Sequence, residues 1–509
     1  MNEKKVVLIS TFPDIQAYGI RMLSAMLKNA GFETNLIFLN APFGALYSED
    51  VLKQVADISE DSLFVGISVM TNFFERAKQV TLFLKKHSKI PVVWGGIHTA
   101  IKPEECLQYA DMICIGEAEN TIVPFAQNLA SANSFSQMDN VWLKVKGEII
   151  KHRVVPLVNN ISNLPLPDYE YKNHFVIDNR RLAAMDLKSM EQYMGYAYQT
   201  LATRGCFYNC SYCANNFFDK NFSSANTMKI RSRKMEDVVK EFIWIKKYLN
   251  YVRIFKIADD LFLALPKKEI ETFCKLYEES GLRMPLDISG VHPSILSEDK
   301  FNLLTEVGLQ YVRMGIQSGS ERTRNLYGRH ETNSRILESA NILGKYKSRL
   351  KSIHYDFIVD NPWETPEEIK ESLRLLVQIP KPYRLNIFSL TLYPGTDLYA
   401  KAKNEGIIND EYSQVYNKHY HDNVAISYYN GLFKIISTYK LPGKYFTFLI
   451  ENESTLSAKT IYFILIRGIN LVVLLKRLIY LIKEGAFDII SGKFKRINKF
   501  IFVRSKVVH

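Results

Sequence analysis

Three cysteines follow one another closely near the middle of the chain, with three residues between the first two and two between the last two. They are Cys206, Cys210 and Cys213. Thiolates at this spacing on one loop can bind three irons of a cubane 4Fe-4S cluster, because such clusters require soft sulfur ligands. The other cysteines, Cys106, Cys114 and Cys274, have no spacing that would supply a fourth ligand. One iron of the predicted cluster would therefore stay open to a substrate or cosubstrate.

A zinc knuckle is the alternative interpretation of these cysteines. Structural zinc sites generally have four ligands, and no histidine or further cysteine follows Cys213 at a suitable distance. Six cysteines in 509 residues are no disulfide framework, and an oxygen-sensitive cluster needs a reducing compartment. We therefore favour the cluster. We expect a cytoplasmic protein, because residues 1–5 lead into a short apolar strand without a signal-peptide cleavage site.

The same segment, with Tyr212 directly before the last cysteine, resembles the signature of the radical S-adenosylmethionine (SAM) superfamily. The resemblance implies that Cys206, Cys210 and Cys213 bind the cluster, that SAM chelates the open iron, and that Tyr212 lies against the adenine. It also implies that one electron, from a reducing partner such as flavodoxin or ferredoxin, cleaves SAM to a 5'-deoxyadenosyl radical.

Residues 1–130 alternate short apolar strands with helical patterns, which is typical of a doubly wound, Rossmann-like parallel sheet. The expected strands are residues 6–10, 33–38, 63–69, 92–94 and 112–115. Ligands of such sheets bind at the carboxyl ends of the strands, where small and polar residues follow here. These residues are Thr71, Asn72, Gly95, Gly96, His98, Gly116 and Glu117. Paired glycines let the backbone approach a large flat ligand, although a tight turn alone would also explain them.

Four strings in this region resemble the cobalamin-binding domain that is fused to many radical SAM enzymes. They are Gly66-Ile-Ser-Val-Met-Thr-Asn-Phe73, Val93-Trp-Gly-Gly-Ile-His98, Pro103-Glu-Glu105 and Gly116-Glu-Ala-Glu119. The resemblance implies that the strand-end residues named above contact cobalamin. The motif Asp-x-His-x-x-Gly, through which other cobalamin proteins ligate cobalt, is absent. We therefore expect a cobalt without a histidine ligand, and His98 as a loop contact to the corrin or a structural residue.

Strands and helices alternate again over residues 196–405, where further strings resemble the partial (β/α)6 barrel of radical SAM enzymes. They are Phe255-Lys-Ile-Ala-Asp-Asp260, Met314-Gly-Ile-Gln-Ser-Gly-Ser320, Asp356-Phe-Ile-Val-Asp-Asn-Pro-Trp-Glu-Thr365 and Leu390-Thr-Leu-Tyr-Pro-Gly-Thr-Asp-Leu-Tyr399. Adjacent carboxylates at a strand end need a positive partner. The resemblance implies the SAM amino group as this partner for Asp259 or Asp260, and a helix N-cap is the alternative role for one of them.

Other positions in these strings depart from the pattern of the family. Gln317 stands where the family usually has Glu, so a neutral amide would meet SAM or the substrate there, followed by Ser320. Asp360 and Trp363 stand where glycine is commoner, so the shape of that turn is not fixed by the resemblance.

The segments on either side of the barrel are less regular. Residues 131–195 are expected to form a linker and active-site cover, with a hairpin that turns at Lys146-Gly147. Residues 406–509 are expected to be helical and basic, since residues 420–509 contain 14 Lys and Arg against 5 Asp and Glu.

An apolar stretch, residues 461–482, dominates this C-terminal region. It is a poor membrane span because Arg467, Lys476 and Arg477 interrupt it. More basic residues follow at Lys493, Lys495 and Arg496. The stretch would either cap the barrel or make a peripheral contact with an anionic membrane surface.

These features predict an α/β enzyme that resembles the cobalamin-dependent radical SAM methyltransferases and methylates an unactivated carbon of a lipid or secondary metabolite. The resemblance implies that methylcobalamin donates the methyl group after the radical has removed hydrogen. One alternative keeps cobalamin but performs cyclisation, rearrangement or redox chemistry, and another is an inactive cobalamin-binding sensor. A methylthiotransferase is disfavoured, because only Cys106 and Cys114 could serve its second cluster. The nearly neutral enzyme core argues against nucleic acid as a partner.

Overall fold

The computed structural model describes residues 4–131, 138–224, 227–420 and 424–483, apart from the side chains of residues 473 and 476–483. The chain divides into two compact units. The first consists of Met1–Ile369 and Ile379–Ala425, and the second of Lys370–Gln378 and Ile426–His509. All the strands of the described residues belong to the first unit, and the second is helical.

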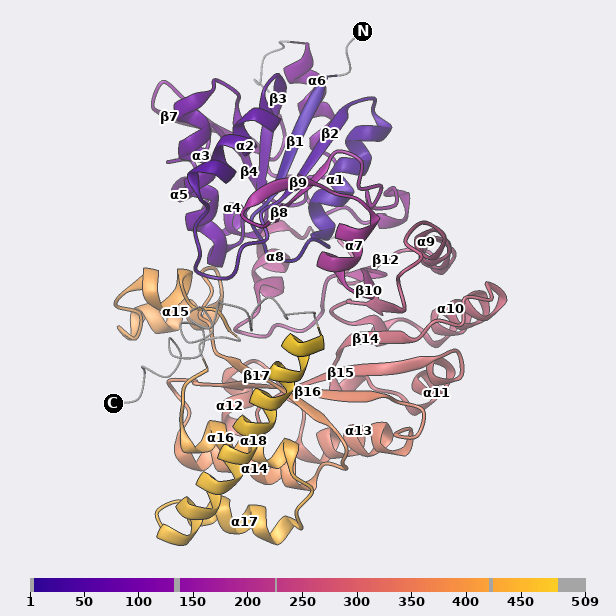
Figure 1. The fold of residues 1–509 in the computed structure, drawn as a ribbon, viewed down its shortest axis with the longest axis vertical. Helices are drawn as coiled ribbons and strands as arrows, with labels where there is room; N and C mark the ends of the chain where they lie inside the picture. Colours follow the sequence, from indigo (N-terminus) through magenta and orange to yellow (C-terminus); the bar gives the residue numbers. More distant parts are fainter. Residues whose placement is uncertain (1–3, 132–137, 225–226, 421–423, 484–509) are drawn as a thin grey trace. The chain divides into compact units, whose positions relative to one another are not determined.

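The first unit begins with a nine-stranded sheet in the order β7-β6-β5-β4-β3-β1-β2-β8-β9 (Figure 1). Its strands are β1 (Lys5–Ser10), β2 (Glu33–Phe38), β3 (Ser62–Ser68), β4 (Val92–Gly95), β5 (Met112–Cys114), β6 (Val141–Val145), β7 (Glu148–Lys151), β8 (His174–Asp178) and β9 (Arg181–Ala184). The strands from β5 to β8 in this order run parallel. This arrangement confirms the predicted doubly wound sheet, whose strand order reverses between β1 and β3.

The helices that accompany this sheet pack on its apolar strands and with one another, α1 against α6 and α2 against α3. They are α1 (Tyr18–Asn29), α2 (Glu49–Ser59), α3 (Phe74–His87), α4 (Ile97–Ile101), α5 (Pro103–Cys106), α6 (Ile122–Ala130) and α7 (Leu187–Met194). The core of the sheet also includes side chains from far along the chain, among them Leu390, Val415 and Tyr416. Residues 406–425 therefore belong to the first unit, and not to the C-terminal helical region as predicted.

Strands β6 to β9, within residues 141–184, complete both edges of this sheet, so this part of the predicted linker also builds the first sheet. β6 and β7 form the predicted hairpin around Lys146 and Gly147, and β6 pairs antiparallel with β5. At the opposite edge, β8 pairs parallel with β2, and β9 pairs antiparallel with β8. The sequence did not indicate this role, because the partner of β8 lies far earlier in the chain.

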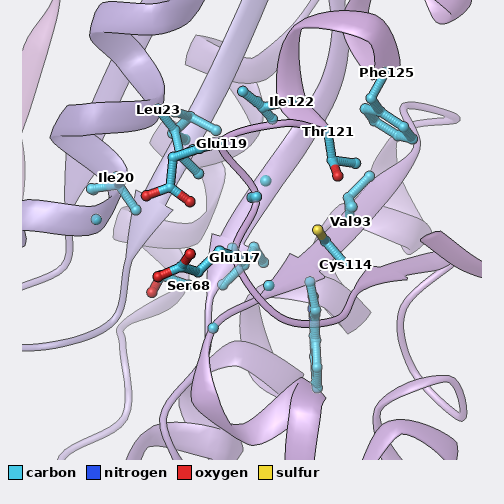
Figure 2. Close-up of a pocket in the computed structure, with 18 of the residues that line it drawn as sticks. Ile20, Leu23, Ser68, Val93, Cys114, Glu117, Glu119, Thr121, Ile122 and Phe125 are labelled. Atoms are coloured by element: carbon cyan, nitrogen blue, oxygen red, sulfur yellow. The ribbon is translucent and has the colours of Figure 1, made fainter. Parts of the chain in front are cut away.

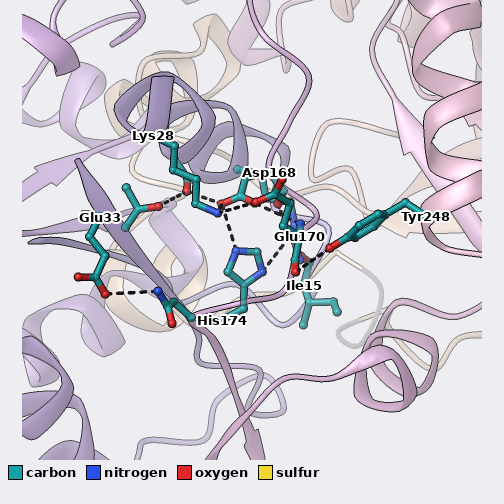
Figure 3. Close-up of polar contacts among 11 residues, drawn as sticks. Ile15, Lys28, Glu33, Asp168, Glu170, His174 and Tyr248 are labelled. Carbon is teal, nitrogen blue, oxygen red and sulfur yellow. Dashed lines mark hydrogen bonds and ion pairs between the residues drawn. The ribbon is translucent and has the colours of Figure 1, made fainter. Parts of the chain in front are cut away.

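A buried polar network fastens this segment to α1 (Figure 3). The Asp168 carboxylate accepts a hydrogen bond from Ser24 Oγ at 2.6 Å and pairs with Lys28 Nζ at 2.9 Å. Arg21 Nη1, which can only donate, lies 3.5 Å from His174 Nδ1. His174 Nδ1 is therefore the acceptor, and Nε2 carries the hydrogen that reaches Asp168 Oδ2 at 3.2 Å. Burial lowers the pKa of His174 to about 4, so the ring is neutral.

The first unit continues with a sheet of six parallel strands in the order β10-β13-β14-β15-β16-β17. The strands are β10 (Ala197–Thr200), β13 (Ile254–Ile257), β14 (Leu286–Val291), β15 (Leu309–Gln317), β16 (Ser352–Val359) and β17 (Arg384–Ser389). The helices are α8 (Ala214–Phe222), α9 (Met235–Tyr248), α10 (Lys267–Glu279), α11 (Glu298–Glu306), α12 (Glu321–Leu326), α13 (Asn333–Lys345), α14 (Pro366–Gln378) and α15 (Asp397–Asn404), followed by the π-helix η5 (Tyr412–Tyr416). This alternation confirms the predicted partial (β/α)6 barrel. A short antiparallel ribbon, β11 (Thr203–Arg204) and β12 (Arg231–Ser232), precedes and follows the cysteines.

The second unit contains the end of α14 with α16 (Tyr428–Thr438), α17 (Gly443–Glu451) and α18 (Leu456–Lys483). Within it, Arg374 Nε donates to Glu451 Oε1 at 2.7 Å, and Tyr439 Oη donates to Leu465 O at 2.8 Å. No helix in the described part of the chain is long and apolar enough to cross a membrane. Some of the predicted basic residues of the tail cannot be placed. Lys493, Lys495 and Arg496 lie outside the described residues, as do the side chains of Lys476 and Arg477.

Candidate active site

The three cysteines lie on the loop between β11 and α8, and hydrogen bonds hold this loop to the rest of the barrel. Ser211 N donates to Tyr327 O at 3.0 Å, and Leu398 N donates to Ser211 O at 2.9 Å. Gly328, with a φ of +68°, permits a close approach of the loop, since a Cβ there would lie 2.8 Å from Asn209 O. The end of α12 and the start of α15 therefore fix the cysteine loop.

The thiols of Cys206, Cys210 and Cys213 are free and affect one another electrostatically. Burial raises the pKa of Cys206 to about 12, and Asp260 and the other two cysteines add to this rise. The remaining cysteines lie in other elements: Cys106 in α5, Cys114 in β5 and Cys274 in α10. The loop thus offers three sulfur ligands and no fourth, which fits a 4Fe-4S cluster with one open iron.

Asp259 and Asp260 have different surroundings. Asp259 is 2% exposed, and its carboxylate accepts hydrogen bonds from Ala202 N at 2.8 Å and from Thr203 N and Oγ1, each at 2.7 Å. Burial raises the pKa of Asp259 to about 7. Asp260 instead lines a cavity of about 360 Å³ together with Cys206, which we call the cluster cavity. Asp260 can meet a ligand beside the cluster, whereas Asp259 holds the backbone that leads into β11 and caps no helix.

Arg329 is a residue of this site that the sequence did not indicate. It is 5% exposed, and it donates from Nε to Glu331 Oε1 and from Nη2 to Gly315 O, both at 2.8 Å. Burial raises the pKa values of Cys210 and Tyr212, and the Arg329 charge acts against this rise. A positive charge therefore lies beside a predicted cluster ligand. A single arginine in a turn has no characteristic spacing, so only the fold reveals this position.

Tyr212 and Gln317 come together at a second cavity of about 240 Å³, the barrel cavity, beside β15, β16 and β17. Gln317 ends β15 with a φ of +70°. Ser320 lies just before α12 and is 1% exposed, and its Oγ has no hydrogen-bond partner among the described residues. Tyr212 and Gln317, which the resemblance assigns to SAM or substrate, thus share one wall of this cavity.

The turn after β16 keeps the shape that a glycine would give it. Asp360 has a φ of +58°, which Asp tolerates better than most residues, and its Oδ2 accepts a hydrogen bond from Ala425 N at 2.9 Å. Trp363 Nε1 donates to Glu405 Oε2 at 2.6 Å. The two departures from the family pattern therefore leave an ordered turn.

A third cavity, of about 210 Å³, opens at the carboxyl ends of β1, β3 and β4 and is called the first-sheet cavity (Figure 2). Its rim includes Gly95, Gly96, Gly116 and Glu117. Its walls are mostly apolar, with Leu23 from α1 and Phe125 from α6, and Glu119 lies with Glu117 at one side. The size and the mostly apolar walls of this cavity suit a flat apolar group.

Thr71, Asn72 and His98, which the resemblance assigns to cobalamin contacts, are not among the residues that line this cavity. His98 is fully buried, with Nδ1 3.1 Å from Thr71 Oγ1 and its ring 5.5 Å from that of Tyr416. Asn72 Nδ2 donates to Lys418 O at 2.7 Å. These side chains hold the segment around η5 against the first sheet, which agrees with the structural alternative for His98.

Ion pairs join the first-sheet cavity to the cysteine loop. Arg204 Nη1 lies 2.5 Å from Glu119 Oε1 and 3.2 Å from Glu117 Oε1, and Arg231 Nη1 lies 2.7 Å from Glu117 Oε2. Burial would raise the pKa of Glu117, but the two arginines hold it below its ordinary value. Glu117 lines both the first-sheet cavity and the cluster cavity, so the two cavities adjoin at this residue.

Two family models match the chain in the regions that contain these cavities. The B12 binding domain matches residues 4–126, and the radical SAM superfamily matches residues 200–376. The first match covers all the residues that line the first-sheet cavity except Val141, and the second covers the cysteine loop and most of the barrel.

Two characterised relatives are similar over most of the chain. The bacteriochlorophyllide d C-8(2)-methyltransferase of Chlorobaculum tepidum is 28% identical over 361 residues, which cover 69% of this chain and 71% of that protein. The anaerobic magnesium-protoporphyrin IX monomethyl ester cyclase of Synechocystis sp. is 22% identical over 311 residues, which cover 60% of this chain and 57% of that protein.

Solved structures show the same fold. The radical SAM methyltransferase TsrM from Kitasatospora setae matches with a TM-score of 0.62 and 16% identity, covering 79% of this chain and 76% of that chain. The cobalamin-dependent SAM radical enzyme OxsB matches with a TM-score of 0.59 and 16% identity, covering 80% of this chain and 56% of that chain. The chain is therefore an enzyme of the radical SAM superfamily with a B12-binding domain, and its cofactors are a 4Fe-4S cluster, SAM and cobalamin.

Proposed function

We propose that the chain is a cobalamin-dependent radical SAM methyltransferase that acts on an unactivated carbon. One observation carries the proposal: Glu117 lines both the first-sheet cavity and the cluster cavity, so the two cavities that we propose for cobalamin and SAM adjoin. Two cofactors can act on one substrate atom only when they are held at short range, because proximity supplies most of the rate in such a reaction.

The residues of the chain have distinct tasks in this proposal. Bound together, the three cofactors supply a methyl group and a radical that removes a hydrogen atom from carbon. Cys206, Cys210 and Cys213 hold the cluster, and the Asp260 carboxylate accepts hydrogen bonds from the SAM ammonium group. Gly95 and its neighbours give the backbone room to approach cobalamin.

We propose a lipid or a secondary metabolite as the substrate, since the relatives named above act, by their names, on a bacteriochlorophyllide and a protoporphyrin ester. The name of the second relative supports the alternative of cyclisation without methyl transfer. Methyl transfer is favoured because the methyltransferase relative is more similar and is matched over more of its length. The mass of the product separates the two, since methylation adds one CH2 group.

We propose two further partners for the protein. A flavodoxin or ferredoxin would reduce the cluster. A membrane surface would be contacted by α18, whose apolar side chains remain accessible; they include Phe463 (52% exposed), Ile464 (65%) and Leu471 (57%). The charge of the C-terminal residues would favour anionic lipid.

Anaerobic reconstitution tests the proposed function. The full chain with cluster, cobalamin, SAM and a reductant should produce both 5'-deoxyadenosine and S-adenosylhomocysteine when a methylated product forms. Cys210→Ala should lose cluster binding and both products, while Cys274→Ala, in α10, should retain them. If 5'-deoxyadenosine formed together with a product that had gained no CH2 group, methyl transfer would be excluded and the cyclisation or redox alternative would be favoured.

A further inference from the structure

The barrel cavity holds an arginine with two unused donors. Arg313, in the middle of β15, donates from Nε to both carboxylate oxygens of Asp356 at 2.8 and 2.7 Å. Asp356 Oδ1 also accepts from Asn386 Nδ2 at 2.8 Å. Neither terminal Nη nitrogen of Arg313 has a hydrogen-bond partner within the described residues. The guanidinium plane is thus fixed at one edge, and the other edge is available at the cavity wall.

A second polar group in the same cavity also lacks a partner. Ser389, at the end of β17, lines the cavity and is 2% exposed, and its Oγ has no hydrogen-bond partner in the part of the chain that the structure describes. A buried hydroxyl without a hydrogen-bond partner is destabilising, because it has lost its hydrogen bonds to water. A ligand atom in the cavity would remove this cost.

The remaining walls combine aromatic, aliphatic, hydroxyl and amide side chains. Phe388 lies below the Arg313 guanidinium, 5.2 Å from Cζ to the ring centroid, and Tyr393 and Tyr420 extend the aromatic surface. Gln317 adds a neutral amide. Such a site combines a planar donor pair with apolar walls, as small-molecule pockets do.

We propose that the barrel cavity binds a carboxylate of the substrate, which Arg313 holds through Nη1 and Nη2 while the aromatic walls contact the adjoining apolar part. The proposal rests on the proposed function and narrows its substrate to an apolar acid. A planar guanidinium matches a carboxylate with two parallel hydrogen bonds. Asp356 already balances the Arg313 charge, so a monoanionic carboxylate suits the site better than a phosphate dianion.

Binding of small aromatic probes to the reconstituted full chain tests the proposal without turnover. Phenylacetate should bind at least tenfold more tightly than phenylacetamide, its neutral analogue, and phenylphosphonate should bind no better than phenylacetate. Arg313→Gln should lower the affinity for phenylacetate to that for phenylacetamide. Arg384→Gln removes an exposed arginine at the start of β17 and should change nothing. Ligand-detected NMR and calorimetry give these affinities.

Arg313→Lys guards against a folding failure of the glutamine variant, since it keeps a charge beside Asp356 and loses the paired donors. It should fold and bind phenylacetate more weakly than the parent. Equal binding of acid and amide, or preference for the phosphonate, would overturn the proposal. So would a loss of SAM binding in Arg313→Lys, because the cavity would then belong to SAM. The test measures binding and not methyl transfer. Its results therefore stay interpretable even if the protein does not transfer methyl groups.

Discussion

Asp259 and Asp260 are neighbours in the chain, but their carboxylates face different partners. Asp259 satisfies two backbone N–H groups and a hydroxyl, and Asp260 opens on the cluster cavity. The sequence predicted that one of them meets SAM and could not say which, because strand twist and loop path decide where each side chain points.

We expect Asp260→Asn to weaken SAM binding by on the order of 1.5–3 kcal/mol, the range for hydrogen bonds to charged groups. Asp259→Asn should lower Tm and leave SAM affinity unchanged, because its amide can no longer accept from all three donors. Calorimetry with SAM and thermal unfolding measure the two effects. Equal losses of SAM affinity in both variants would contradict this assignment.

Arg329 should tune the cluster. Its charge stabilises the more negative, reduced form, so Arg329→Met should shift the reduction potential in the negative direction by on the order of tens of millivolts. Arg329→Lys retains the positive charge and should shift the reduction potential less. Comparing the two variants separates the effect of the charge from the effect of altered packing. A redox titration followed by electron paramagnetic resonance measures the potential. An unchanged potential in a folded Arg329→Met protein would exclude this role.

His174 should make stability depend on pH. Its pKa is about 4 in the folded chain and about 6.5 when unfolded, so the unfolded chain binds more protons between these values. The free energy of unfolding should therefore fall as pH drops from 6.5 to 4, by roughly 3 kcal/mol at most. His174→Gln should flatten this decline in urea unfolding, whereas the same change at exposed His87 should not. If the free energy of unfolding of His174→Gln fell equally with pH, other titratable groups would be responsible for the pH dependence.

At the scale of elements, strands β1 to β5 of the first sheet were largely predictable, because buried parallel strands carry apolar runs that the sequence displays. β2 (Glu33–Phe38) agrees with its prediction residue for residue. β8 was missed, since a five-residue strand is recognised only through its distant partner, β2. The contacts of Asn72 and His98 were not predictable for a similar reason, because they come from residues 415–418.

Gly205, between β11 and the cysteines, should be essential for cluster assembly. Its φ is +97°, and a Cβ there would collide with Lys229 O. Gly205→Ala should therefore bind far fewer than about four irons per chain. Gly281→Ala is the matched control, since this glycine also has a positive φ, +68°, but has no atom within 4 Å of the added Cβ. Iron and sulfide analysis measures the difference between the two variants. A full iron content in Gly205→Ala would contradict the prediction that this glycine is essential for cluster assembly.

At the scale of the whole molecule, α18 provides the test of membrane contact. Ile464→Asp and Leu471→Asp should abolish co-sedimentation of the full chain with vesicles that contain anionic lipid, because each places a charge on the accessible apolar surface. Ile426→Asp is the control, since Ile426 is 92% exposed but lies outside the helix. Binding of the parent should decrease at high salt. No binding by the parent would exclude the membrane contact.

The contact between η5 and the first sheet has a consequence for biosynthesis. Phe74 and His98 are covered by Tyr416, which the ribosome adds more than three hundred residues after them. Until then, an apolar patch of the N-terminal sheet faces water or a chaperone, although all the residues that line the first-sheet cavity have been made. The nascent chain should thus be able to acquire one cofactor site well before its core closes, and a translational pause between these points would prolong its exposure to aggregation.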